Sequence, residues 1–383
     1  MNIGIDATNV GGGGGITHLV EILHHLNPHD FNISKVYVFS SQRVLEKLPT
    51  KDFIIKYNDN YLNGSLVMRL FFQLFKFDSI LKSNCDVLFS VTGDYIGSFR
   101  PVVGMSRNML LYDRKVVSEI NSINQKIKFR LSFYRQKFSF EKSKGVIFIS
   151  QIAKTLASKY IDLENVNTTL IHHGISAKFS NSPKRQLGIK EYSFNNPFKF
   201  LYVSTIHMYK HQWNVVKAIG NLRYQGYPVS LVLVGGSIFA PAGNLLDETI
   251  NEVDPKGEFV DWKGHIEYSE IQNIYKEING IVFASTCENM PNILLESMYS
   301  GSAIACSNTQ PMPEFLKEFG FYFDPHSVRS IQEALIMMLE DPEKRENFIL
   351  HNQQEIKKYS WDKTSHDTFD FILSCFHNFN NNV

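Results

Sequence analysis

Short apolar runs alternate with longer amphipathic segments along most of this chain. In the first half, runs that read as buried strands lie at residues 3–5, 36–39, 87–89, 102–103 and 146–149. In the second half they lie at residues 200–203, 231–234, 259–260, 281–284 and 303–306. Segments with helical spacing, such as residues 17–26 and much of 330–379, lie between or after them. This alternation is typical of α/β domains built on mostly parallel sheets.

The chain is 383 residues long, which exceeds the size at which one hydrophobic core usually stops growing. A polar stretch over residues 181–197 contains Pro183, Gly188 and Pro197, so it reads as a connection between domains. We therefore predict two doubly wound domains with a cleft between them. In such sheets, ligands bind outside the carboxyl ends of the strands.

The composition narrows the class of protein. A hydrophobic content of 43% and a charged content of 20% describe an ordinary globular protein, and a net charge of +1 argues against a nucleic-acid binder. The four cysteines are scattered without a Cys-x-x-Cys pair, which indicates a reducing compartment. The N-terminus lacks signal-peptide features, and no run of about 18 apolar residues occurs. We expect a cytoplasmic protein.

The most informative segment covers residues 285–296, where Glu288 and Glu296 stand eight positions apart. It follows the predicted strand at residues 281–284, so Glu288 is expected in the loop at the carboxyl end of that strand. Pro291 suits the first position of a helix, and Gly301 suits its end.

The predicted helix after Pro291 can hold an anion. Asn292 and Glu296 are spaced i and i+4, so they share one helical face. The first backbone N–H groups of a helix, here those of Asn292, Ile293 and Leu294, have no partner within the helix. A phosphorylated sugar fits such a combination of carboxylates and N–H groups.

Three other features of the sequence carry weaker signals. The glycines at 11–15 begin five residues after the first strand, and the next strand ends in Ser40-Ser41 without an acidic residue. The glycine run is therefore a poor match to a dinucleotide-binding fingerprint.

Residues 114–144 contain nine Lys/Arg residues and two acidic residues, interleaved with aromatic residues. This pattern fits either a helix that binds an anionic membrane surface or a helix with a solvated basic face. Residues 66–81, with four phenylalanines, read as a core helix rather than a membrane anchor.

These pieces together resemble retaining glycosyltransferase family 4, whose members have the GT-B fold. Glu288 and Glu296 are similar to its E-x7-E motif, and residues 297–301 resemble the continuation. Further segments that resemble the family are 201–204 with Lys210, 231–236, 260–264, 171–175 and 359–361. The resemblance implies an acceptor-side domain over 1–180, a linker over 181–197, a donor domain over 198–360, and a C-terminal helix over 361–383 that packs back on the first domain.

The resemblance also implies roles. Lys210 would stabilise the leaving diphosphate, Glu288 would lie at the transferred sugar, and Glu296 would accept hydrogen bonds from the ribose. The implied donor site comprises Glu296, Asn292, Ile293, Met290, Asn289, Ser204, Thr205, Gly264 and Gly235. The implied acceptor side comprises Gly13, Gly14, Gly15, Arg107, Asn108 and His173. No Asp-x-Asp triplet occurs, so neither a metal nor another cofactor is expected.

The chain departs from the family pattern twice. No arginine precedes Lys210 within residues 204–209, which leaves His207 and His211 as candidates for part of the missing charge. Arg107 and Asn108 stand where many members carry a histidine. Arg107 is either an anion ligand or a surface residue.

The resemblance implies a retaining, metal-independent glycosyltransferase. It would move sugar from a nucleotide sugar to a saccharide or lipid-linked saccharide in bacterial O-antigen or capsule synthesis, at the inner face of the plasma membrane. Two alternatives stay open: a nucleotide-sugar epimerase of the same fold, and a non-catalytic nucleotide- or carbohydrate-binding module. An NAD-dependent oxidoreductase is disfavoured by the poor glycine fingerprint.

Overall fold

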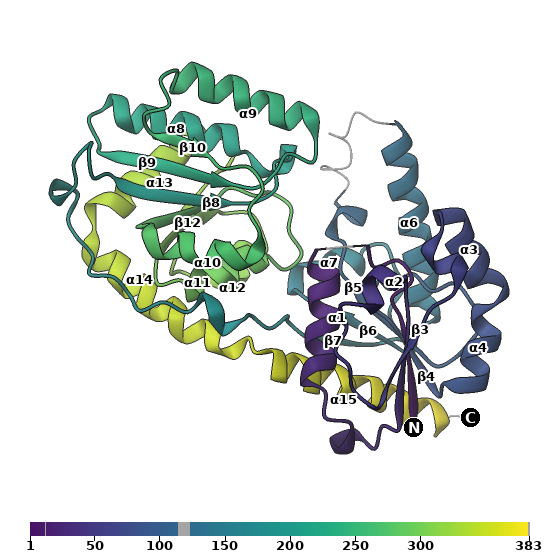
Figure 1. The fold of residues 1–383 in the computed structure, drawn as a ribbon. Coiled ribbons are helices and arrows are strands. Elements are labelled where there is room, and N and C mark those ends of the chain that lie inside the picture. The colour runs from purple at the N-terminus through teal and green to yellow at the C-terminus, as the bar shows by residue number, and fades with distance from the viewer. Residues whose placement is uncertain (12, 114–122, 382–383) are drawn as a thin grey trace. The chain divides into compact units, whose positions relative to one another are not determined.

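A computed structural model describes residues 1–11, 13–113 and 123–381, which form two compact units (Figure 1). Unit 1 comprises Met1–Gly174 and Tyr359–Val383, and unit 2 comprises Ile175–Lys358. Each unit is built on one parallel sheet with helices in the connections, which confirms the predicted fold class of two Rossmann-like α/β domains. Gly12 and the first residues of the basic segment, 114–122, lie outside the described residues.

The sheet of unit 1 has seven strands in the order β3-β2-β1-β4-β5-β6-β7. These strands are β1 (Asn2–Asp6), β2 (Lys35–Phe39), β3 (Ile54–Tyr57), β4 (Val87–Ser90), β5 (Val102–Ser106), β6 (Gly145–Phe148) and β7 (Asn167–Leu170). The helices are α1 (Gly14–His25), α2 (Gln42–Leu45), α3 (Leu66–Phe75), α4 (Phe77–Asn84), α6 (Ile123–Lys142), α7 (Gln151–Ala157) and α15 (Trp361–Asn380). The central strands β4 and β5 are buried along their whole length.

The sheet of unit 2 has six strands in the order β10-β9-β8-β11-β12-β13. They are β8 (Phe198–Val203), β9 (Val229–Val234), β10 (Val260–Trp262), β11 (Gly280–Phe283), β12 (Ala303–Ser307) and β13 (Phe321–Phe323). The helices are α8 (Gln212–Tyr224), α9 (Ala240–Val253), α10 (Tyr268–Glu277), α11 (Asn292–Tyr299), α12 (Met312–Leu316), α13 (Val328–Glu340) and α14 (Pro342–Glu355).

Each sheet has one point where the order of strands reverses direction. In unit 1 this point lies between β1 and β4, and in unit 2 it lies between β8 and β11. The loops that leave two such strands at their carboxyl ends diverge to opposite sides of the sheet, and the crevice between them is the usual ligand site of an open α/β sheet. In unit 2 the loop after β8 carries Lys210, and the loop after β11 carries Glu288.

The predicted linker over residues 181–197 is wrong in its boundaries, because this segment is part of unit 2. Its backbone is fixed by buried partners: the fully buried Arg345 donates through Nε to Gln186 at 2.9 Å and also to the carbonyl of Leu187. Gln353 donates to the carbonyl of Asn181 at 2.7 Å. The chain passes between the units at residues 174–175 and again at 358–359.

The C-terminal helix α15 belongs to unit 1, where it packs along α1. Ser365 donates to the carbonyl of Ile22 at 2.7 Å, and Thr364 donates to the carbonyl of His172 at 2.8 Å. Ser360 caps the helix by accepting a hydrogen bond from the N–H of Lys363. These contacts hold a segment from the end of the chain against one from its beginning.

Residues 66–81 do not form the single core helix that their phenylalanines suggested. The segment breaks at Lys76 into α3 and α4. Phe77 and Leu81 of α4 are buried, whereas α3 buries Phe72 and Gln73 and leaves most of its other apolar side chains exposed. The interpretation of α3 as a core helix is therefore corrected.

Candidate functional site

The feature that defines the site is a largely buried ion pair between Lys210 and Glu288. The Lys210 ammonium contacts the Glu288 carboxylate, and their side chains are 10% and 17% exposed. The two residues come from the loops after β8 and β11, so the pair bridges the point where the strand order reverses. The lysine ammonium also lies over the ring of Phe283, 5.4 Å from its centroid. A sequestered positive charge is thus held where this fold binds ligands.

Backbone contacts fix the two loops to each other. Thr286 donates its N–H to the carbonyl of Tyr209 at 2.9 Å, and its hydroxyl reaches the same carbonyl at 3.2 Å. Tyr202, at the end of β8, donates to the carbonyl of Lys210 at 2.6 Å. The position of Lys210 is therefore set by the main chain on both sides, which is the preorganisation that electrostatic stabilisation requires.

Glu296 lies on α11 and is almost fully buried, with 3% of its surface exposed. The Tyr268 hydroxyl donates to Oε1 at 2.6 Å, and Oε2 has no hydrogen-bond partner within the described part of the chain. Burial raises the pKa of the Glu296 carboxyl to about 7, although the hydrogen bond from Tyr268 opposes part of this rise. The free oxygen is an acceptor that a ligand hydroxyl can fill.

The start of α11 differs in detail from the prediction. Pro291 precedes the helix as its N-cap residue rather than occupying its first position, and the N–H of Asn292 donates to the carbonyl of Met290 at 3.0 Å. That N–H group is therefore not free for an anion, and the prediction that it would be free is wrong. The Asn292 side chain adds a second buried oxygen, Oδ1, with no partner in the described chain, one helical turn before Glu296.

The carboxyl ends of β8, β9 and β10 are joined at Gly235. Its N–H donates to the carbonyl of Gly264 at 2.7 Å, and its carbonyl accepts from the Trp262 indole at 3.0 Å. Gly235 has a φ of +141°, and a Cβ placed on it would lie 1.9 Å from the carbonyl oxygen of Ser204. Ser204, Gly235 and Gly264, three of the predicted donor residues, are thus brought together. Thr205, beside them, is exposed.

Replacing Gly235 with alanine is expected to lower the free energy of unfolding by about 3 kcal/mol, because both the backbone conformation and the close carbonyl exclude a side chain. Gly236 is the matched control. A Cβ on Gly236 meets only the Cβ of His265, at 3.5 Å, so Gly236→Ala is expected to stay within about 0.5 kcal/mol of the parent. Urea unfolding measures both. Equal losses in the two variants would contradict this account of the loop.

The two histidines near Lys210 do not replace the missing arginine. Burial, with the neighbouring His326 second, lowers the pKa of His211 to about 4. Burial, with Lys210 second, lowers the pKa of His207 below its ordinary value. Both rings are therefore neutral at neutral pH, and Lys210 is the positive charge that the described residues hold at this point.

Unit 1 brings together some of the residues that were predicted for the acceptor side. Arg107 packs on the first turn of α1, since a Cβ on Gly15 would lie 3.0 Å from its Nη1. Burial lowers the pKa of the Arg107 guanidinium to about 10. The buried His173 ring lies 4.7 Å from that of His18 and is stacked on Trp361. Gly13 is the N-cap residue of α1, with Gly14 the first residue of the helix.

His18, which the sequence reasoning missed, is fully buried on α1, and neither ring nitrogen has a partner in the described chain. Burial, His173 and Arg107 together hold its pKa well below the ordinary range. The signal that the sequence offered was a histidine within the helix predicted at residues 17–26. Asn108 has a local role, because its side chain caps the 3-10 turn Met109–Leu111 by accepting from the N–H of Leu110 at 3.1 Å.

Asp6 was also missed. It ends β1, is fully buried, and accepts a hydrogen bond from the Thr8 hydroxyl at 2.7 Å. Burial, with Asp94 second, raises its pKa to about 6. An acid at the carboxyl end of the first strand was visible in the sequence and carries the strand-end signal of this fold.

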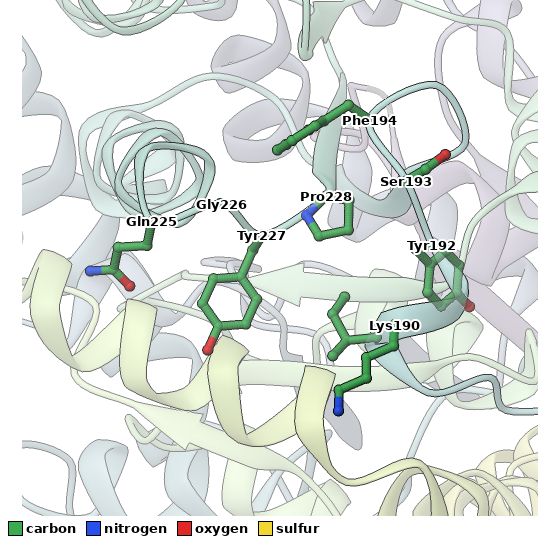
Figure 2. A pocket seen from close by; sticks show the side chains of 9 residues that line it. Lys190, Tyr192, Ser193, Phe194, Gln225, Gly226, Tyr227 and Pro228 are labelled. Carbon is green, nitrogen blue, oxygen red and sulfur yellow. The ribbon is translucent and has the colours of Figure 1, made fainter.

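A separate pocket of about 390 Å³ lies in unit 2 (Figure 2). Its lining includes Tyr192, Phe194, Tyr227 and Pro228. Pro228 immediately precedes β9, so the pocket lies at the amino ends of the strands, away from Lys210 and Glu288. None of the predicted site residues lines it.

Comparisons with known proteins find similarities to glycosyl transferases. Residues 185–355 match the family model of group 1 glycosyl transferases. O-antigen chain mannosyltransferase B of Escherichia coli is 22% identical over 173 residues, which cover 44% of this chain and 44% of that protein. This chain is thus aligned with less than half of the relative's length.

Two solved structures resemble the whole chain. Anabaena HepE in complex with UDP and glucose has a TM-score of 0.70 and 18% identity, with 98% of this chain and 99% of that chain covered. Sucrose-phosphate synthase from Thermosynechococcus elongatus has a TM-score of 0.73 and 16% identity, with 99% and 100% covered. The chain therefore has the GT-B fold, and its likeness to group 1 glycosyl transferases lies within unit 2.

Proposed function

We propose that this chain is a glycosyltransferase that takes a sugar from a nucleoside-diphosphate sugar and passes it to a saccharide acceptor. The observation that carries the proposal is Glu296, a buried carboxylate with one oxygen bound to Tyr268 and the other without a described partner. An ionised carboxylate only accepts hydrogen bonds, which suits the hydroxyls of a ribose. Residues 185–355, which match the glycosyl transferase model, contain this carboxylate.

Lys210 would stabilise the leaving diphosphate. As the bond between sugar and phosphate breaks, negative charge develops on the phosphate oxygen, and a fixed ammonium in a largely buried place lowers the energy of that charge. In the unliganded protein Glu288 balances the ammonium. When the diphosphate binds, the ammonium gains a second partner and Glu288 becomes available to the hydroxyls of the sugar.

We further propose that transfer proceeds with retention and without a metal. We assign the Glu288 carboxylate, which is paired with Lys210 before the donor binds, to the hydroxyls of the sugar rather than to attack on the anomeric carbon, so that no covalent sugar–enzyme intermediate forms. The acceptor would attack from the side of the leaving group. No group of three or more potential metal-ligating side chains occurs among the described residues, and the charge that a metal would supply is assigned to Lys210.

The pathway follows from the relative rather than from the site. The E. coli protein is an O-antigen chain mannosyltransferase, which supports a role in bacterial surface polysaccharide synthesis, with a saccharide or a lipid-linked saccharide as the proposed acceptor. The HepE complex contains UDP, which makes UDP the first nucleotide to test.

The donor site is tested by thermal shift with UDP, GDP and ADP. The matching nucleotide at a hundredfold excess over its Kd is expected to stabilise the protein by about 2.7 kcal/mol, and Glu296→Ala should abolish the shift. The sugar conjugate of the nucleotide that binds is then incubated with candidate acceptors in EDTA, and NMR of the product reports the anomeric configuration.

Transfer with retained configuration in EDTA supports the whole proposal. An epimerised donor without transfer would instead favour the nucleotide-sugar epimerase. If none of the three nucleotides produced a thermal shift, the non-catalytic module would be favoured. An inverted product would leave the transferase and remove the retaining mechanism.

A further inference from the structure

Exposed apolar side chains are concentrated on two helices of unit 1. Ten of the seventeen exposed large hydrophobic residues in the described chain lie on α3 and α6, six on the first and four on the second. Isolated exposed apolar residues are ordinary, but a contiguous group marks a surface that another partner covers. We call the outward sides of these two helices the α3–α6 surface.

Helix α3 turns nearly all of its apolar side chains outward. Val67 is 75% exposed and Phe75 is 70% exposed, and the group also contains Leu66, Met68, Phe71 and Leu74. Phe72 and Gln73 occupy the opposite, buried side. The helix contains Arg69 and no acidic residue.

Helix α6 carries an apolar stripe along its outward side. Ile127, Leu131, Tyr134 and Phe138 are spaced i, i+4, i+7 and i+11, so they form one row, and all four are exposed. Exposed basic residues flank this row: Lys126 and Arg130 follow one side, and Lys128 and Lys142 follow the other. An apolar row between basic borders is the pattern of a helix that lies in a membrane interface.

The inward sides of the two helices are firmly fixed, so the exposed sides do not result from loose packing. Arg135 of α6 donates to Gln73 of α3 at 2.7 Å, and Gln73 donates to Thr8 at 2.7 Å. Arg135 also pairs with Asp94 at 3.2 Å. This network ties α3 and α6 to each other and to the loop after β1, and Figure 1 shows the two helices side by side within unit 1.

We propose that the α3–α6 surface docks on a lipid bilayer with anionic headgroups. Seven basic residues and one acidic residue, Glu141, lie within the two helices, and Glu141 is already paired with Lys137 at 2.9 Å. The exposed basic residues therefore complement anionic lipid, while the apolar row enters the acyl boundary. None of the described helices is long and apolar enough to cross a membrane, and α3 has ten residues, so the contact is peripheral.

The same charges disfavour a second copy of the chain as the partner. Two α3–α6 surfaces pressed together would place like charges opposite one another, whereas an anionic bilayer brings the opposite sign. The proposal does not depend on the transfer reaction, because nucleotide binding by unit 2 is measured separately.

Co-sedimentation with vesicles tests the proposal. The full chain is mixed with vesicles of phosphatidylcholine alone or of phosphatidylcholine with phosphatidylglycerol, at low and high salt. We expect binding to the anionic vesicles only, with weakening at high salt. The triple variant Lys126→Gln, Lys128→Gln and Arg130→Gln should bind about a hundredfold more weakly, at about fivefold for each charge.

Apolar variants provide an independent arm. Val67→Ser, Phe71→Ser and Phe75→Ser together should abolish binding while leaving the circular dichroism spectrum and nucleotide binding unchanged, because all three side chains are exposed. The matched control removes three exposed apolar side chains from unit 2, Tyr224→Ser, Met337→Ser and Leu350→Ser, and should bind like the parent.

Three outcomes would overturn the proposal. One is a parent protein that stays in the supernatant or binds both vesicle types equally. Another is an α3 variant, or a basic variant, that binds as well as the parent. The third is a parent that light scattering shows to be a dimer and that the α3 variant converts to a monomer without any vesicle binding.

Discussion

Lys210→Met is expected to lower kcat about a thousandfold, with a much smaller effect on the KM for the donor. The ammonium is largely buried and fixed at the end of β8, so it acts most strongly on charge that develops in the transition state. Loss of one such preorganised partner typically costs two to three orders of magnitude, or about 3–4 kcal/mol. Initial rates of sugar transfer over a range of donor concentrations measure both constants.

The matched control is Lys263→Met. Lys263 pairs with Asp261 at 2.7 Å in the same unit, but the two side chains are 41% and 57% exposed, so this variant should keep the parent rate. Glu288→Gln should also lower kcat, and it should destabilise the unliganded protein because it leaves the Lys210 charge largely buried without its partner. A parent-like rate in Lys210→Met would remove Lys210 from the mechanism.

Glu296→Gln is expected to stabilise the unliganded protein at pH 8 while weakening nucleotide binding about tenfold or more. The folded pKa of Glu296 is raised from 4.5 to about 7, so the folded state binds a proton more tightly than the unfolded state. Stability is therefore lost as the pH rises from about 4.5 through 7, and the full loss is about 3 kcal/mol above that range. Glutamine has no charge to bury and avoids the loss.

Urea unfolding at pH 5 and at pH 8 measures the effect, together with nucleotide titrations at pH 8. The stability difference between Glu296→Gln and the parent should be small at pH 5 and grow towards pH 8. Glu333→Gln removes an exposed carboxylate of unit 2 and should stay within about 0.5 kcal/mol at either pH. A difference that does not change with pH would show that burial does not perturb Glu296, and unchanged nucleotide affinity would remove it from the donor site.

The central strands were predictable, whereas three of the four edge strands were not. All three strands that the sequence pattern missed, β3, β7 and β13, lie at the edge of a sheet. The strand β7 has two threonines and no fully buried residue, and β13 has only three residues. Apolar runs report burial on both faces of a sheet, so a strand with one partner and partial exposure leaves a weak signal.

Local chemistry was predictable where it depends on strand ends. The loops with Lys210 and Glu288 follow clear apolar strands, and the structure joins them. The pairing of Tyr268 with Glu296 was not predictable, because it joins residues 28 positions apart through tertiary packing. The same holds for the exposed face of α3, since four phenylalanines in a helix do not reveal which side meets the core.

The polar composition of residues 181–197 led to the wrong prediction of a connection between domains. A polar, proline-containing stretch usually indicates a free connection, but here a buried arginine uses the backbone carbonyl of Leu187 as a hydrogen-bond partner. Satisfying Arg345 requires acceptors, and an irregular segment offers more free carbonyl groups than a strand or helix does. Arg345, the residue whose hydrogen bonds fix this segment, lies more than 150 positions later in the chain.

The two crossings of the chain, at 174–175 and 358–359, make unit 2 an insertion within unit 1. A Cβ on Gly174 would lie 2.2 Å from the backbone nitrogen of Trp361, so the outgoing and returning segments touch within unit 1. During synthesis, α15 can cover α1 and the sheet of unit 1 only after the whole of unit 2 has emerged from the ribosome. In a chain that is still attached to the ribosome, the face of α1 that binds α15 therefore stays exposed until α15 emerges. Unit 2 is the part of the chain that can complete its fold first.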